Sequence, residues 1–133
     1  MEDRYLSKAK RIDNGEWIVG YLYRLSENNP PFIMLCSKYG ESYEVDEHTI
    51  CQCTGLKDKN GKLIWENDIV QDKRGSLYKT FWRDKYYQFS WACIKSDIFR
   101  IGAEWGLWSF KRFEIEVIGN IFDNKELLES EEK

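Results

Sequence analysis

The stretch CTGLKDKNGKLIWENDIVQD, from Cys53 to Asp72, places two turn signals between apolar runs. Asn60-Gly61 is the dipeptide most typical of a tight β-hairpin, because both residue types tolerate a positive φ. Glu66-Asn67-Asp68 precedes the apolar pair Ile69-Val70 and indicates a second turn, in which we expect the Asp68 carboxylate to accept backbone hydrogen bonds. The stretch therefore predicts antiparallel strands joined by short turns.

Working outward, β-branched and aromatic residues predict further strands, and helical periodicity is almost absent. We expect strands at residues 17–25, 31–37, 42–45, 49–56, 62–65, 69–73, 77–82, 86–94, 99–103, 107–110 and 113–122. A short helix is expected over residues 125–131, capped by Asn124. Many short strands with frequent turns predict an all-β fold, either a barrel or a sandwich.

The composition is that of one globular domain. The chain has 133 residues, of which 42% are hydrophobic, 32% charged and 16% aromatic, and the aromatic share favours strands. Its longest apolar run, Phe32 to Cys36, is far too short to cross a bilayer, so we expect a cytoplasmic protein with no membrane contact. The four cysteines, Cys36, Cys51, Cys53 and Cys93, are then expected to be reduced thiols.

The residues that could carry chemistry form no recognisable set. A zinc site needs two pairs of ligands, whereas Cys51 and Cys53 make one pair, with His48 as the lone histidine. A Cys–His nucleophile also needs a group that orients the base and a donor for an oxyanion. Neither the orienting group nor the oxyanion donor is identifiable in the sequence. The glycines form no phosphate-binding loop. The carboxylate pair Glu66 and Asp68 fits a turn better than general acid–base catalysis. We therefore expect no catalytic residue, metal or cofactor.

A basic and aromatic segment leaves a binding function open. Residues 57–112 carry twelve Lys and Arg against seven Asp and Glu, together with most of the aromatic residues. One cluster between two predicted strands could contact single-stranded nucleic acid through stacking and positive charge: Lys79, Trp82, Arg83, Lys85 and Tyr86. Against this, the whole chain carries a net charge of −3, and aromatic residues in strands are usually core.

Three ordered blocks resemble the YopX family of phage and prophage proteins: Asn14 to Tyr23 (NGEWIVGYLY), Tyr43 to Val70, and Glu116 to Glu129. The resemblance implies a single YopX-like, mainly β domain with a small SH3-like barrel in its later part, and a gene carried by a phage or an integrated element. It implies no activity. Asn67 stands where the family usually has Gly, and Asn tolerates left-handed geometry best among the other residues.

On this basis we expect N-terminal strands in residues 1–48, a barrel core in 49–122 and a short helix or tail in 123–133. Trp17, Tyr21, Ile69, Val117 and Ile121 are expected in the core, and Asn60, Gly61, Asn67 and Asp68 as structural turn residues. For function, we expect a non-enzymatic phage or prophage accessory protein that binds another protein or a second copy of itself. Single-stranded nucleic-acid binding is the alternative.

Overall fold

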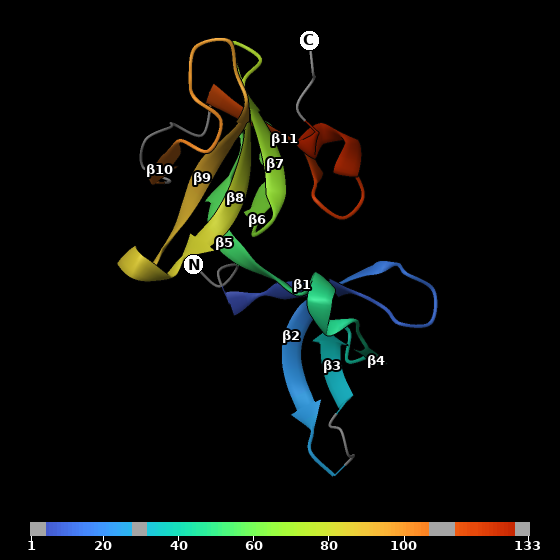
Figure 1. Cartoon of the computed structure of the whole chain (residues 1–133). Coiled ribbons are helices and arrows are strands. Elements are labelled where there is room, and N and C mark those ends of the chain that lie inside the picture. The colour runs from blue at the N-terminus through green and yellow to red at the C-terminus, as the bar shows by residue number, and fades with distance from the viewer. Residues whose placement is uncertain (1–4, 28–31, 107–113, 130–133) are drawn as a thin grey trace. The chain divides into compact units, whose positions relative to one another are not determined.

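The computed structural model describes residues 5–27, 32–106 and 114–129, which form two antiparallel sheets (Figure 1). The chain divides into two compact units, Met1–Gly55 (unit 1) and Leu56–Lys133 (unit 2). The mainly β fold predicted from the sequence is confirmed. None of the helices in the described ranges is long and apolar enough to cross a membrane.

Unit 1 is built from hairpins whose strands follow one another in the chain. Its elements are β1 (Ser7–Lys10), β2 (Trp17–Leu25), β3 (Phe32–Ser37), β4 (Ser42–Glu44), the 3-10 turn η2 (Glu47–Thr49) and β5 (Cys51–Lys57), which continues past Gly55 into unit 2. The strand order of this six-stranded sheet is β4-β3-β2-β1-β5-β6, in which the last strand, β6 (Leu63–Trp65), belongs to unit 2. One face of this sheet packs Ala9, Leu35 and Val45 into a small core.

The strand β1 was not predicted. Its sequence, SKAK, offers a single apolar side chain, Ala9, which is fully buried. β1 is a strand because both of its edges are paired, with β2 along its whole length and with β5 through Ser7 and Lys8. Pairing with two neighbours thus outweighs the weak local preference of this segment for a strand.

Unit 2 contains the predicted hairpin and a five-stranded sheet. Its elements are β6 (Leu63–Trp65), β7 (Asp68–Asp72), β8 (Leu77–Arg83), η3 (Asp84–Tyr86), β9 (Gln88–Lys95), β10 (Glu104–Gly106), β11 (Ile115–Asn120) and η6 (Lys125–Leu128). The order in the sheet is β10-β9-β8-β7-β11, every pair antiparallel. The described strands close no barrel, so the SH3-like barrel is not confirmed.

Both faces of the unit 2 sheet carry a core. One cluster gathers Ile64, Val70, Tyr78, Trp91, Cys93, Ile115 and Val117. A second cluster on the opposite face gathers Ile69, Leu77 and Ile94, and Ile118, Ile121 and Leu127 pack against it. Adjacent residues such as Ile69 and Val70 serve opposite clusters, as the alternation of side chains along a strand requires.

Two predicted elements differ from the structure. The expected strand at residues 99–103 is a loop, because the Ser96 hydroxyl accepts the N–H groups of Ile98 and Phe99, and Gly102 has a φ of 90°. The strand begins only at Glu104. The expected strand at 107–110 lies outside the described residues, as do Phe113 and Pro31.

The expected helix at 125–131 is a 3-10 turn over Lys125–Leu128, and residues 130 and 131 are not described. Asn124 stands at the N-cap position as predicted, but its side chain makes no capping hydrogen bond to the turn. Its side-chain oxygen accepts instead from the backbone N–H of Asn120, at 3.1 Å, and so tightens the turn that follows β11.

The core prediction was correct in unit 2 and partly wrong in unit 1. Ile69 and Val117 are buried, and Ile121 is half-buried against Ile69. Trp17 is only half-buried, and Tyr21 is 50% exposed, so its assignment to the core was wrong. The reason is that β2 presents alternate residues to two faces, and only the face opposite Tyr21 carries the unit 1 core.

Candidate functional site

The hairpin at Asn60-Gly61 depends on a residue that the sequence analysis overlooked. Gly61 has a φ of 81°, and its N–H donates to the Asp58 carbonyl. The side chain of Asp58 is buried, and one carboxylate oxygen accepts the N–H groups of Asn60 and Lys62, both at 2.9 Å. The other oxygen accepts the N–H of Val117 in β11, at 2.8 Å. One carboxylate thus joins the hairpin loop to a strand far along the chain.

These contacts set the charge state of Asp58. Burial raises the pKa of the Asp58 carboxyl. The N–H donors of Val117, Lys62 and Asn60 together lower this pKa by a larger amount, so the net pKa lies below the ordinary value of an aspartate. The group is therefore an anion at neutral pH, and it accepts hydrogen bonds from the backbone N–H groups of Asn60, Lys62 and Val117. It supports the fold and is badly placed to exchange a proton with a substrate.

The second turn has the expected form. Asn67 has a φ of 73°, and its backbone donates to the Thr80 carbonyl and accepts from Ile121. Asp68 is buried and accepts the Trp65 N–H at 2.8 Å, as the sequence predicted. This turn therefore connects three segments of unit 2.

A third aspartate, Asp72, organises one end of the same sheet. Its Oδ1 atom accepts the N–H groups of Arg74 and Ser76, both at 3.0 Å, and its Oδ2 atom accepts the Tyr78 hydroxyl at 2.8 Å. Burial, followed by the bond to Asp72, raises the pKa of Tyr78 far above its ordinary value. The tyrosine stays neutral and serves as a hydrogen-bond donor.

A cavity of about 280 Å³ lies beside this network, between the β7–β8 turn and the end of β9. It is lined by Arg74, Gly75, Ser76, Lys95, Ser96, Asp97 and Ile98. The Ser76 and Ser96 hydroxyls share a hydrogen bond of 2.8 Å. Both signs of charge line the cavity, and no sequence motif marked it.

The structure disperses the basic and aromatic cluster predicted as a nucleic-acid contact. Lys79 and Arg83 project from one face of β8, whereas Trp82 projects from the other and packs edge-on against Phe89 at 5.1 Å. The Arg83 guanidinium pairs with Glu104 at 2.5 Å and lies 4.6 Å from the centre of the Tyr86 ring. Lys85 approaches the same ring at 5.7 Å. Arg83, Lys85 and Tyr86 are thus the members that share one place.

Tyr87, which adjoins this cluster, has an unusual backbone. Its φ is 52°, in the left-handed region that bulky residues rarely adopt, and its side chain is 83% exposed. The sequence did not predict the positive φ of Tyr87, because Asp84-Lys85-Tyr86 contains no glycine and no dipeptide typical of such a turn. A strained backbone that presents an aromatic ring to water makes this turn a candidate contact point.

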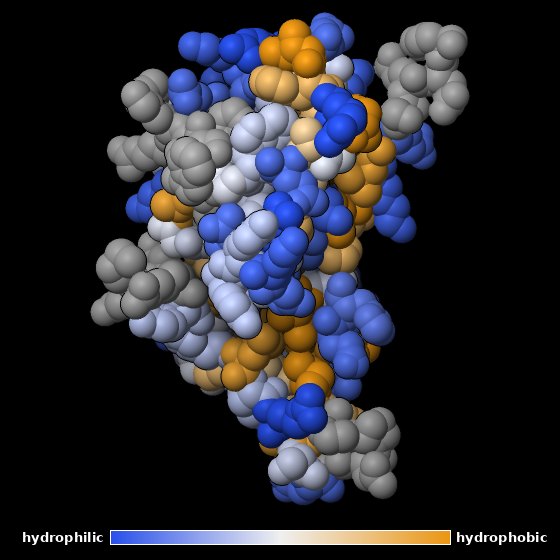
Figure 2. Space-filling model, turned by 60° about the vertical axis from the view of Figure 1, so that its left-hand side comes forward, coloured by the Kyte–Doolittle hydropathy of each residue, from blue (hydrophilic) through white to orange (hydrophobic). Residues whose placement is uncertain are grey.

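A second group of exposed aromatic residues lies on unit 1. By strand register, the side chains of Trp17, Val19, Tyr21, Tyr23, Phe32, Met34 and Cys36 share one face, here called the ribbon face. Val19, Tyr21, Tyr23 and Phe32 are between 39% and 50% exposed. Residues of high hydropathy, drawn in orange, also reach the surface between hydrophilic residues on the side seen in Figure 2. Alternation of apolar and polar residues along β2 would have identified the exposed face from the sequence. Both faces of β2 carry apolar residues, so this signal is missing.

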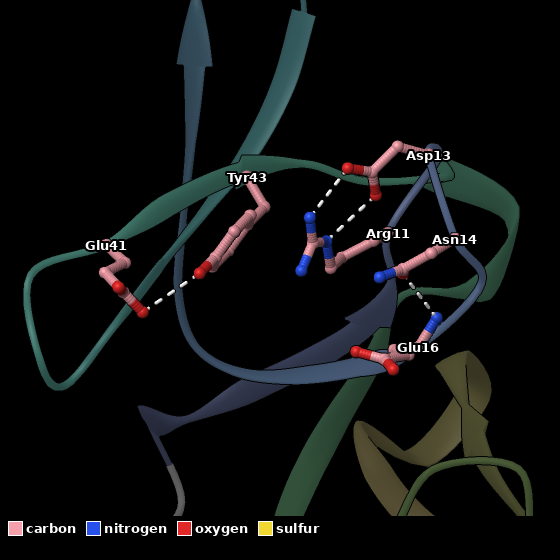
Figure 3. A network of polar contacts seen from close by, with 6 residues as sticks. All are labelled: Arg11, Asp13, Asn14, Glu16, Glu41 and Tyr43. Atoms are coloured by element: carbon pink, nitrogen blue, oxygen red, sulfur yellow. Dashed lines mark hydrogen bonds and ion pairs between the residues drawn. The ribbon is translucent and has the colours of Figure 1, made fainter.

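On unit 1, a network of polar side chains joins the turn after β1 to β4 (Figure 3). Arg11 donates to both carboxylate oxygens of Asp13, at 2.9 and 2.6 Å, and its guanidinium lies 4.2 Å from the centre of the Tyr43 ring. The Tyr43 hydroxyl donates to Glu41 at 2.9 Å. The bond to Asp13 raises the pKa of Arg11, the same bond lowers the pKa of Asp13, and Glu41 raises that of Tyr43. The network fixes the turn against β4.

The thiols and the histidine are not brought together as a ligand set. His48 lies exposed in η2 and donates its backbone N–H to Asp46. Cys51, Cys53 and Cys93 are buried and Cys36 is half-buried, all as free thiols, and burial raises the pKa of Cys93. Within the part of the chain that the structure describes, no three His, Cys, Asp or Glu residues are grouped to bind a metal.

A comparison with protein families matches residues 11–129 to the family described as YopX protein. The chain belongs to the YopX family. No curated protein shows a sequence match to it.

Two glycines in the YopX blocks have a structural role that the geometry explains. A Cβ atom on Gly20 would lie 2.0 Å from the Cys36 carbonyl oxygen, so β2 and β3 approach too closely there for any side chain. A Cβ on Gly119 would lie 2.5 Å from Oδ1 of Asn124. Gly119 follows the bulge in β11 at Val117. Gly20 therefore permits the close approach of two backbones, and Gly119 leaves room for the Asn124 side chain.

Proposed function

We propose that this YopX-family chain is a non-enzymatic accessory protein of a phage or prophage that acts in the cytoplasm by binding another protein. The ribbon face of unit 1 is the proposed contact surface. One observation carries the proposal: β2 and β3 leave aromatic and aliphatic side chains in water on one face, while their other face forms the core of unit 1.

The energetics of exposure favour this reading. Covering apolar surface gains roughly 25 cal/mol per Å², and tyrosine and tryptophan contribute disproportionately at protein interfaces. Tyr21 and Tyr23 present rings that lose little conformational entropy when they become ordered. A face that carries several such residues gains free energy when a partner covers it.

Charge favours a protein over a nucleic acid as the partner of this face. Residues 1–55 carry six Lys and Arg against nine Asp and Glu, so the unit that bears the ribbon face is acidic overall. Nucleic-acid-binding surfaces instead gather positive charge along the contact. The non-enzymatic part of the proposal is supported by Asp58, Asp68 and Asp72, whose carboxylates accept hydrogen bonds within turns.

The test is site-specific photo-crosslinking in host cells that express the protein. The photoreactive p-benzoylphenylalanine replaces Tyr21 on the ribbon face or, as a matched control, Tyr39, which is 80% exposed in the β3–β4 turn. We expect a discrete protein adduct from position 21 and none from position 39. No adduct at position 21, or the same adducts at both positions, would contradict the proposal.

Single-stranded nucleic-acid binding is a second candidate, favoured by the turn that carries Tyr86 and Tyr87. Arg83 and Lys85 lie by the Tyr86 ring, and Tyr87 is presented to water by a left-handed backbone. Such rings can stack on bases while the cations contact phosphates.

Titration of labelled oligonucleotides at low and moderate salt tests this candidate. If the protein binds single-stranded nucleic acid, binding should weaken as the salt concentration rises and should be lost when Lys79, Arg83 and Lys85 are replaced by Gln. Absence of binding at low salt would exclude it.

A further inference from the structure

We propose that the protein partner docks as an extended segment on the outer edge of β2, where it adds a strand to the unit 1 sheet beside residues 21–25. This inference rests on the protein-binding function proposed above and deepens it, because it names the mode of binding and the residue types of the partner's contact segment. The edge borders the ribbon face, to which Tyr21 and Tyr23 belong.

The strand β2 extends beyond the strand that covers its outer edge. β1 pairs with β2 between Trp17 and Gly20, whereas β3 pairs with β2 from Gly20 to Leu25. Figure 1 shows the later half of β2 continuing beside β3 after it has left β1. Among the described residues, none pairs with the β1 side of residues 21–25. This side is here called the open edge.

The strand register shows which way the backbone groups of β2 point. Along a strand, the N–H and C=O groups of one residue point to one neighbouring strand, and those of the next residue point to the other. The Leu6 carbonyl accepts the N–H of Cys53 in β5, so the next residue, Ser7, points toward β2. Ser7 is opposite Gly20, and Gly20 therefore points toward β1.

Alternation from Gly20 directs the N–H and C=O groups of Leu22 and Arg24 to the open edge. The pairing on the other side of β3 agrees with this direction. The Ile33 carbonyl accepts from the residue that follows β4, so Met34 points toward β2, where it is opposite Tyr23. Tyr23 thus bonds to β3, and its two neighbours present their backbone groups to the open edge.

The sequence of this stretch does not protect the open edge against pairing. Exposed edges of natural sheets are commonly guarded by proline, by lysine, by a bulge or by very short strands. Residues 21–25, YLYRL, contain no proline and no lysine, and their register with β3 is regular. When a segment adds to such an edge, main-chain hydrogen bonds provide affinity and flanking side chains provide specificity.

The side chains beside the open edge define the residues that a partner segment should carry. Tyr21, Leu22 and Tyr23 are exposed and favour apolar residues opposite them. Arg24 is exposed as well, and its guanidinium has no carboxylate partner in the part of the chain that the structure describes. An Asp or Glu opposite Arg24 would supply one. An antiparallel segment therefore carries an acidic residue followed by three apolar residues.

Charge also favours another protein over a second copy of this chain. If two β2 strands paired about Tyr23, all the outward backbone groups would be used, but Arg24 of each copy would be opposite Leu22 of the other. If they paired about Arg24, two guanidinium groups would meet, and like charges directly opposite each other are destabilising. Neither register gives Arg24 a carboxylate.

Amide hydrogen exchange of the full chain, followed by NMR, tests the open edge in the unbound protein. We expect the amides of Leu22 and Arg24 to exchange rapidly, and those of Tyr21 and Tyr23 to be protected by their bonds to β3. Protection of Leu22 and Arg24 in dilute protein would overturn the inference, because the edge would already be covered. Protection that grows with protein concentration would overturn it in favour of self-association.

The probe for binding is the end-blocked peptide Thr-Thr-Glu-Val-Val-Val-Thr-Ser, whose Glu is designed to lie opposite Arg24. Added peptide should slow the exchange of Leu22 and Arg24. N-methylation of the second valine removes a donor that faces Leu22 and should weaken binding about tenfold. N-methylation of the first valine, the matched control, removes a donor that points away from the protein and should leave binding unchanged. Replacing the Glu of the peptide by Lys should weaken binding severalfold.

No protection up to the solubility limit of the peptide, equal binding of the two methylated peptides, or equal binding of the Glu and Lys peptides would each overturn the inference.

A pair of substitutions at Arg24 tests the backbone of the protein itself. Arg24→Pro removes an outward N–H without removing a bond to β3, and proline is tolerated where the N–H of an edge strand faces solvent. Arg24→Ala keeps this N–H and is the matched control. Arg24→Pro should abolish peptide binding, whereas Arg24→Ala should weaken it severalfold. Circular dichroism confirms that both variants are folded, and equal binding by the two variants would refute strand addition.

The crosslinking experiment separates this inference from the function on which it rests. With the photoreactive residue at position 21, an adduct that is lost in Arg24→Pro and kept in Arg24→Ala supports both. An adduct that is kept in Arg24→Pro, or one between two copies of this chain, refutes the inference and leaves the protein-binding function standing. No adduct without these substitutions refutes the function and, with it, the inference.

Discussion

Replacing Asp58 should destabilise unit 2 more than any change to an exposed acidic residue. Its carboxylate accepts three backbone N–H groups, from Asn60, Lys62 and Val117, within 2.9 Å, and is buried. Asp58→Ala leaves these donors without an acceptor; the bond to Val117 is buried, those to Asn60 and Lys62 are part-buried, and a fully buried donor that loses its partner costs about 1–3 kcal/mol. Because such losses overlap, we expect the free energy of unfolding to fall by about 3–5 kcal/mol, a large part of a typical total of roughly 5–15 kcal/mol.

Asp58→Asn should have a smaller effect. Its remaining carbonyl oxygen can still accept from Asn60 and Lys62, but its amide group would face the Val117 N–H, donor against donor. We expect a loss of about 1–3 kcal/mol. Urea unfolding followed by tryptophan emission measures both variants, with exposed Asp84→Ala as the control. The reasoning is refuted if Asp58→Ala has the same midpoint as that control.

The pH dependence provides an independent check. The folded-state pKa of Asp58 lies below its value in the unfolded chain, which is about 3.9 for an unperturbed aspartate. Its contribution is therefore fully present above the unfolded pKa and is lost as the pH falls through the folded pKa. The stability difference between unmodified protein and Asp58→Asn should be constant from neutral pH to about pH 5 and should shrink below about pH 4.

Three further substitutions have defined outcomes. Asn67→Ala should be less stable than Asn67→Gly by about 1 kcal/mol in urea unfolding, because the φ of 73° suits glycine and strains alanine; equal stability would contradict this. Thr80→Val keeps the shape but removes the acceptor of the buried Trp91 indole N–H, at 2.8 Å, and should lower the free energy of unfolding in urea by about 1–3 kcal/mol; an unchanged urea midpoint would contradict this. Gly119→Ala should strongly lower the melting temperature, and adding Asn124→Ala should recover part of this loss because it removes the Asn124 Oδ1 and Cγ atoms that would clash with the new Cβ. If the effects of the two single substitutions simply add in the double variant, the clash is not the cause.

Local turn chemistry was readable from the sequence, whereas long-range partners were not. The hairpin at Asn60-Gly61, the turn at Asn67-Asp68 and the strand at residues 17–25 followed from residue type and spacing. β1 could not be predicted, because its pairing with both β2 and β5 makes it a strand. Asp58 was missed for the same reason: its partner Val117 is 59 positions away, and no local pattern indicates such a contact.

The candidate site shows the same division. The basic and aromatic residues at 79–86 were found by composition, but period-two alternation sends Trp82 to the face opposite Arg83. Tyr21 was placed in the core because it lies in one of the three YopX blocks, in a mainly apolar strand, and only the register with β3 identifies which face is covered. Sequence patterns thus identify strands more readily than they identify the exposed side of a strand with two apolar faces.

The contact between Asp58 and Val117 also constrains the order of events during biosynthesis. In unit 1, β2, β3 and β4 pair with chain neighbours, so these hairpins can form soon after they leave the ribosome. In unit 2, β7 pairs with β11, and the Asp58 carboxylate also needs β11 because it accepts the Val117 N–H of that strand. Until residue 117 has emerged, Asp58 lacks its third donor and one edge of β7 is open. A nascent chain stalled before β11 should therefore contain the folded hairpins of β2 to β4 together with an incomplete unit 2 sheet. Such a chain would depend on a chaperone or on rapid translation to avoid edge-to-edge association.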